Sequence, residues 1–131
     1  MSGTILVCDN EETLRTLVRA SLDGLDCDIV EARDGEEALE LARRVKPDLI
    51  LLDMMMPRRN GLEVLAELRG DPSFRSTPVI MLTASAQQSD RSAAFEQGAT
   101  RFLAKPFSPV VLSVLVEETL QLIRRQTASA Q

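Results

Sequence analysis

The most informative segment of the chain is Leu49-Ile50-Leu51-Leu52, an unbroken apolar block that is followed directly by Asp53. A second unbroken block, Ile5-Leu6-Val7-Cys8, likewise runs into an aspartate, Asp9. Such blocks are typical of strands covered on both faces, although a piece of buried helix has the same composition. Their short length and the helical patterns that separate them favour strands.

Short apolar runs recur along the chain, and the segments between them carry apolar residues at helical spacing. The expected strands are Thr4–Cys8, Cys27–Ala32, Leu49–Leu52, Val79–Leu82 and Arg101–Ala104. The expected helical stripes are Leu14, Leu17, Val18 and Leu22; Ala38, Leu39 and Ala42; Leu62, Leu65 and Ala66; Ala93, Ala94 and Gln97; and Leu112, Leu115, Val116, Leu120 and Ile123. Strands that alternate with helices in this way predict a doubly wound α/β domain, a (βα)5 unit whose five-stranded parallel sheet has helices on both faces.

Helix start and stop signals support this division. Asp34 is expected to cap the second helix, Ser108 the last one with Pro109 in its first turn, and Gly98 the end of the fourth. Arg124 and Arg125 lie where a helix dipole favours cations. We therefore expect one domain over residues 1–125, and a polar tail over 126–131 that frays.

Composition excludes several classes of function. The chain has 131 residues, 44% of them apolar, and its 20 acidic residues outnumber 15 basic ones for a net charge of −5. Without a basic run it is not expected to bind nucleic acid directly. No apolar stretch approaches the length of a membrane span, and the first residues lack the basic and apolar regions of a signal peptide, so neither is expected. It has no histidine, and its two cysteines lack metal-ligand spacing, which argues against His-based triads and common zinc sites. A cytoplasmic, reduced domain is the simplest interpretation.

Polar side chains follow four of the expected strands, at the edge where a doubly wound sheet binds its ligands. They are Asp9-Asn10-Glu11 after the first strand, Asp53 after the third, Thr83-Ala84-Ser85 after the fourth and Lys105-Pro106 after the fifth. Each has an ordinary interpretation by itself: a strand cap for Asp53, a turn residue for Thr83, a surface lysine for Lys105. Together they predict a site where carboxylate and amide oxygens hold a cation, and oxygen-only ligands suit Mg²⁺. In such a site Asp53 could act as nucleophile or cation ligand.

These residues resemble the response-regulator receiver domain, the CheY-like family of two-component signalling. The matching segments are Ile5–Glu11, Pro47–Pro57, Asn60–Leu65, Pro78–Ala84 and Lys105–Phe107, within a resemblance that covers Thr4 to Ile123. The spacing also fits, because Thr83 lies 30 positions and Lys105 lies 52 positions after Asp53. The resemblance implies a flavodoxin-like sheet with strand order 2-1-3-4-5.

The resemblance also implies a function. Asp53 would be the phosphoacceptor, taking a phosphoryl group from a sensor histidine kinase or a phosphotransfer protein. Mg²⁺ would be held by Asp9, Asn10, Asp53 and the backbone carbonyl of Met55. The phosphoryl-binding and switch residues would be Thr83, Ala84, Phe102 and Lys105, and the Lys105–Pro106 bond would be cis. The domain would catalyse only its own phosphotransfer and dephosphorylation, and would signal to a downstream protein rather than act as an enzyme.

Two positions depart from the family pattern. Asn10 stands where the family usually has a second acid, so one formal charge is lost and weaker Mg²⁺ binding is expected. A shifted register that places Asp9 in that ligand position would put Arg15 and the helical stripe out of step. Phe102 replaces a frequent tyrosine, which keeps the aromatic ring and loses its hydroxyl.

Three other functions are compatible with parts of the same pattern. A pseudo-receiver that binds proteins without phosphorylation is the main alternative, and the presence of Asp53, Thr83 and Lys105 argues against it. A phosphatase of the haloacid dehalogenase type needs an acid where this chain has Met55. A flavin-binding flavodoxin needs a phosphate loop after the first strand, where this chain has acids that would repel a phosphate.

Overall fold

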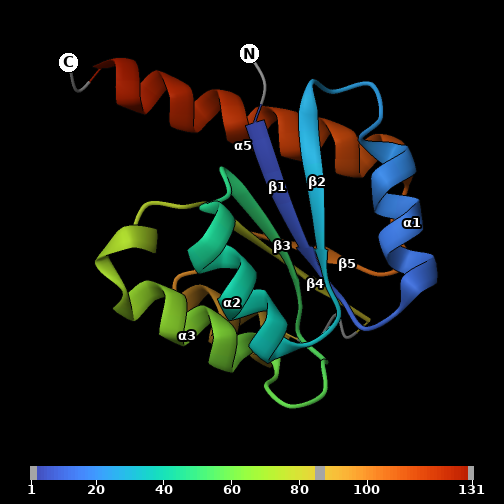
Figure 1. The fold of residues 1–131 in the computed structure, drawn as a ribbon, viewed down its shortest axis with the longest axis vertical. Coiled ribbons are helices and arrows are strands. Elements are labelled where there is room, and N and C mark those ends of the chain that lie inside the picture. The colour runs from blue at the N-terminus through green and yellow to red at the C-terminus, as the bar shows by residue number, and fades with distance from the viewer. Residues whose placement is uncertain (1–2, 85–87, 130–131) are drawn as a thin grey trace.

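The computed structural model describes residues 3–84 and 88–129. It contains a five-stranded parallel sheet in the order β2-β1-β3-β4-β5, which confirms the expected order (Figure 1). The elements are β1 (Gly3–Cys8), α1 (Glu12–Ser21), β2 (Cys27–Ala32), α2 (Gly35–Val45), β3 (Leu49–Asp53), α3 (Gly61–Gly70), the 3₁₀ helix η1 (Pro72–Phe74), β4 (Val79–Thr83), α4 (Gln88–Glu96), β5 (Arg101–Ala104) and α5 (Pro109–Ser129). Each predicted strand is present, with its bounds shifted by one residue at most.

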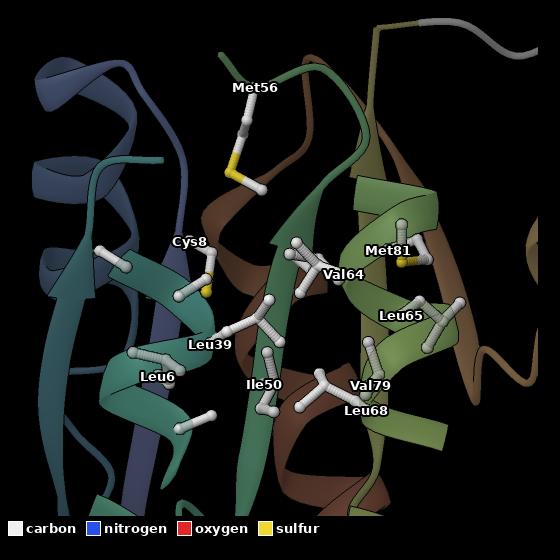
Figure 2. Packing of buried hydrophobic residues seen from close by; sticks show 14 of the residues in the cluster. Leu6, Cys8, Leu39, Ile50, Met56, Val64, Leu65, Leu68, Val79 and Met81 are labelled. Atoms are coloured by element: carbon white, nitrogen blue, oxygen red, sulfur yellow. The ribbon is translucent and has the colours of Figure 1, made fainter. Parts of the chain in front are cut away.

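The unbroken apolar runs are explained by burial on both faces of the sheet. Helices α1 and α5 cover one face, and α2 and α3 cover the other (Figure 1). Because successive side chains of a strand point to opposite faces, each central strand supplies both cores. Toward α2 and α3 lie Leu6, Cys8, Ile50 and Leu52, together with Leu39, Val64, Leu65 and Leu68 (Figure 2). Toward α1 and α5 lie Ile5, Val7, Leu49 and Leu51, together with Val18, Leu22, Leu112 and Val116.

The predicted helix caps are confirmed. The Asp34 side chain accepts a hydrogen bond from the Glu37 amide at 2.9 Å. Ser108 Oγ accepts from the amides of Val110 and Val111 at 3.2 and 3.5 Å. Gly98 follows α4 with φ of +102°, a left-handed conformation that glycine adopts without strain.

Several details differ from the sequence-based expectations. The backbone of α5 is helical to Ser129, so the helix continues over 126–129, where a frayed polar tail was expected. Residues 130–131 lie outside the described part of the chain, as do the side chains of Arg124 and Arg125. Leu17 is exposed instead of packed. Leu17 lies about 100° around α1 from Val18, which is buried. The other buried residue of this helix is Arg15.

The structure also contains a short 3₁₀ helix that was not predicted. The short helix η1 forms where the sequence indicated only the end of a helix, with the Asp71 side chain accepting from the Ser73 amide at 2.9 Å. Among the helices of the described residues, none has both the length and the apolar character needed to cross a membrane.

Candidate functional site

Asp53 is the last residue of β3 and ends the apolar block at the carboxyl edge of the sheet. Only 3% of its surface is exposed. The Met55 amide donates to Asp53 Oδ1 at 3.3 Å, which holds the carboxylate against the turn that follows. The first residue of α3, Gly61, packs so closely on the Asp53 carbonyl that a Cβ there would lie 2.3 Å from this oxygen. The start of α3 therefore packs directly against the end of β3 at Asp53.

Asp9 is fully buried just beyond the end of β1, the strand that neighbours β3. Its backbone amide donates to the carbonyl of Ala32 in β2 at 3.0 Å. One carboxylate oxygen, Oδ1, accepts from the Glu11 amide at 2.8 Å, and the other accepts from Lys105. A buried carboxylate with both oxygens bonded has a defined orientation, so Asp9 faces the site as a fixed negative charge.

Lys105, which directly follows β5, contacts both carboxylates. It follows β5 and begins the cis Lys105–Pro106 bond, as the family resemblance implied. Its amide donates to the Thr83 carbonyl at 2.7 Å. Its Nζ lies 2.7 Å from Asp9 Oδ2 and 3.4 Å from Asp53 Oδ1. With its side chain only 14% exposed, this ammonium links the ends of β1, β3 and β5.

The charges of this cluster do not balance, because two carboxylates share one ammonium. Burial raises the pKa of Asp53 to about 6, and the Asp9 carboxylate adds to the rise, while Lys105 opposes it in part. Burial alone would lower the pKa of Lys105, but its contacts with Asp9 and Asp53 outweigh this and raise the pKa. The site therefore holds a protonated lysine and has an excess of negative charge.

The remaining predicted residues lie around this cluster. Thr83 ends β4 beside Asp53 and is buried, whereas Ala84, Asn10 and Met55 are exposed. Ser85 lies outside the described residues. Phe102 is half-buried on β5 against the α2 and α3 side of the core, with the guanidinium carbon of Arg91 5.1 Å from its ring centre. The sequence-predicted set thus divides into a buried centre and a partly exposed rim.

A family model for the response regulator receiver domain matches residues 5–117 of the chain. The chain belongs to this receiver domain family. It is 40% identical to the alkaline phosphatase synthesis transcriptional regulatory protein PhoP of Bacillus subtilis, over 92% of this chain and 50% of that protein. It spans about half the length of the curated relatives it matches.

Solved structures of similar length show the same architecture. The chemotaxis protein CheY4 of Vibrio cholerae is 30% identical, with a TM-score of 0.81 over 94% of this chain and 99% of that one. The receiver domain of a signal transduction histidine kinase from Syntrophus aciditrophicus is 32% identical, with a TM-score of 0.86 over 94% and 93% of the two chains. This receiver domain therefore has the CheY-like α/β fold.

The donor set of the receiver domain is compatible with a hard divalent cation. Within residues 3–84 and 88–129, no three His, Cys, Asp or Glu side chains gather as a metal cluster. The two buried carboxylates would need neutral oxygens to complete a ligand set, and the Asn10 amide and the Met55 carbonyl are the candidates in the adjacent turns. Oxygen ligands favour Mg²⁺ over softer metals.

The contact of Arg15 with Asp9 was not predicted from the sequence. The Arg15 side chain is buried, and its Nη1 donates to the Asp9 carbonyl at 2.7 Å. A charged residue among helical positions is usually solvated, so periodicity alone did not indicate this contact. The sequence feature that could have indicated it is the position of Arg15, one helical turn after the polar segment that follows β1.

Proposed function

We propose that this receiver domain is a phosphoacceptor switch, in which Asp53 takes a phosphoryl group from the phosphohistidine of a sensor histidine kinase or phosphotransfer protein. The observation that carries this proposal is the placement of the Asp53 carboxylate beside the ion pair between the buried Asp9 and the largely covered Lys105. A carboxylate that served only to cap a strand would not need the ammonium of Lys105 3.4 Å away. Membership of the response regulator receiver domain family also supports this proposal.

The transfer balances as a simple displacement. One carboxylate oxygen of Asp53 forms a bond to phosphorus as the bond between phosphorus and the histidine nitrogen breaks. The departing imidazole takes a proton from water, which gives an acyl phosphate and a neutral histidine. The carboxylate must be ionised to attack. With a pKa raised to about 6, Asp53 is still mostly ionised at pH 7.

The surrounding residues would stabilise the charge that arrives. Lys105 already lies beside Asp53 and would pair with a phosphoryl oxygen. Asp9, Asn10, Asp53 and the Met55 carbonyl would hold Mg²⁺, which when bound offsets charge on the transferring group. Asn10 carries no charge, so this site would bind the cation more weakly than one with a third carboxylate.

Phosphorylation would act as a switch through the end of β4 and the middle of β5. Thr83 lies buried beside Asp53, and a hydrogen bond from its hydroxyl to the phosphoryl group would draw in the segment that begins with Ala84. Phe102, half-buried and in contact with Arg91, would then turn inward. A surface near β5 and α4 would change with it and be recognised by a downstream protein.

The proposal is tested by intact mass after incubation with acetyl phosphate and Mg²⁺. The wild-type chain is expected to gain one phosphoryl group, EDTA to suppress the gain, and Asp53→Asn to abolish it. Asp23→Asn, which removes an exposed carboxylate after α1, is the matched control and should be labelled like the wild type. Equal labelling of Asp53→Asn would overturn the assignment. A wild type that gains nothing from acetyl phosphate or from a phosphohistidine donor would identify a pseudo-receiver.

A further inference from the structure

Arg15 is a buried cation that the proposed chemistry does not use directly. Only 7% of its surface is exposed, although it lies on α1, which faces solvent along one side. We propose that Arg15 is a positioning residue, which holds the main chain at Asp9 and so fixes the acidic side of the phosphorylation site. This inference rests on the proposed function, because it assigns Arg15 to the same site.

The contact to Asp9 is made at the point where the strand ends. β1 stops at Cys8, so the Asp9 carbonyl lies beyond the strand, and the Arg15 guanidinium donates to it at 2.7 Å. The other polar groups of Asp9 are bonded to Ala32, Glu11 and Lys105. Asp9 is thus bonded through its amide, its carbonyl and both carboxylate oxygens, and these four bonds together orient its side chain. Arg15 supplies the bond to the carbonyl, and its donor is charged.

A second contact orients Arg15 itself. Its Nε donates to Glu31 Oε1 at 2.9 Å, and the other oxygen of Glu31 accepts from Arg19 at 2.7 Å. The two arginines lower the pKa of Glu31, with the Arg19 hydrogen bond as the largest cause, so this carboxylate stays ionised. Glu31 lies on β2, beside Val7 of β1. The guanidinium is therefore tied at two points, to β2 and to the turn after β1.

This arrangement explains why a buried arginine stands so near a site that needs acids. The guanidinium does not form an ion pair with the Asp9 carboxylate among the described contacts, so it does not neutralise the charge that a cation would bind. It acts on the backbone instead, which also carries Asn10 one residue later. Removing a residue that hydrogen-bonds to a metal ligand and orients it commonly weakens metal binding tenfold or more.

The chain supplies a matched pair of variants. Arg15→Gln and Arg19→Gln each remove one positive charge and one partner of Glu31, but only Arg15 contacts Asp9. We expect Arg15→Gln to raise the Kd for Mg²⁺ about tenfold. We also expect it to speed hydrogen exchange of the Glu11 amide, which bonds the Asp9 carboxylate, about tenfold relative to the core amide of Leu51. Arg19→Gln should leave both quantities near the wild-type values.

A milder variant keeps the test decisive if Arg15→Gln does not fold. Arg15→Lys retains the charge but cannot fork between Glu31 and Asp9, so both effects should be present and smaller. Equal results for the Arg15 and Arg19 variants in both measurements would overturn the proposal. A wild type that binds no Mg²⁺ would count against the proposed function instead, because Glu11 exchange still reports whether Arg15 holds Asp9.

Discussion

The ammonium of Lys105 lies closer to Asp9 than to Asp53, at 2.7 Å from Asp9 Oδ2 and 3.4 Å from Asp53 Oδ1. The lysine therefore lies closest to the fully buried carboxylate and compensates the charge of Asp53 only in part. Burial raises the pKa of Asp53 to about 6 and the Asp9 carboxylate adds to the rise, so that the pKa stays high even though a cation is its neighbour. A phosphoryl group on Asp53 would bring new negative charge toward the same ammonium.

Removing the ammonium should affect both carboxylates. In Lys105→Met we expect the pKa of Asp53 to rise above 6, because an opposing positive charge is lost. The free energy of unfolding at pH 7 should fall by about 2–4 kcal/mol, because Asp9 remains buried without its partner. Carbon-13 NMR titration of the carboxyl groups and urea unfolding measure the two effects. Arg44→Met removes an exposed cation on α2 and should change neither the Asp53 pKa nor the unfolding free energy by much. An Asp53 pKa that does not change in Lys105→Met would contradict the contact between Lys105 and Asp53.

Restoring a carboxylate at position 10 should strengthen cation binding. Asn10→Asp adds a negative charge next to Asp9, and we expect the Kd for Mg²⁺ to fall about tenfold or more. Isothermal titration calorimetry measures this change. Gln97→Glu adds the same charge at an exposed position after α4 and serves as the control. Equal Mg²⁺ affinity in Asn10→Asp and the wild type would place residue 10 outside the cation site.

The Asp53 carboxylate should reduce the stability of the fold at neutral pH. Asp53 has a folded pKa of about 6 against an ordinary value of 3.8, so the folded chain holds this proton more tightly than the unfolded chain. The cost is absent below about pH 4, grows as the pH rises to 6, and is complete above it. In EDTA at pH 7, Asp53→Asn should therefore be more stable than the wild type by about 1–3 kcal/mol.

The pH dependence separates this effect from a general gain in stability. Urea unfolding at pH 4 should show Asp53→Asn and the wild type nearly equal, since the wild-type carboxyl is then protonated in the folded state. Asp23→Asn, at an exposed position, should show no comparable gain at pH 7. A gain for Asp53→Asn that is the same at pH 4 and pH 7 would contradict the raised pKa.

Two glycines of one helix test how α3 supports the acceptor. In Gly61→Ala the new Cβ would meet the Asp53 carbonyl at 2.3 Å, so the turn between β3 and α3 must shift. We expect a loss of about 2–3 kcal/mol in unfolding free energy and slower phosphorylation. Gly70→Ala, at the other end of α3, meets nothing within 4 Å and should be neutral or slightly stabilising. Equal stability of the two variants would show that the contact at Gly61 is not limiting.

Most of the fold could be predicted from the sequence because its strongest signals are local. Unbroken apolar blocks such as Ile5–Cys8 occur where both faces of a strand are covered, and the structure buries every residue of this block. Asp34 and Ser108 cap helices by contacts within three residues, which a local pattern can indicate. The exposure of Leu17 was not predicted, because it depends on packing beyond the local pattern. The continuation of α5 over 126–129 was not predicted either.

The site was predictable only in part, for a related physical reason. Asp9, Asp53, Thr83 and Lys105 follow strands, and topology brings parallel strand ends to one edge. Which carboxylate the lysine prefers depends on distances of a few tenths of an ångström that no sequence pattern encodes. Arg15 was missed because its partners lie on the Asp9 turn and on β2, and only the folded chain brings them together.

The central claim is that Asp53 is the phosphoacceptor, and locating the phosphoryl group tests it most directly. The chain would be incubated with acetyl phosphate and Mg²⁺, treated with borohydride to reduce the acyl phosphate to an alcohol, and mapped by peptide mass spectrometry. We predict homoserine at position 53 and an unmodified aspartate at position 9. Homoserine at another aspartate, with position 53 unchanged, would contradict the account.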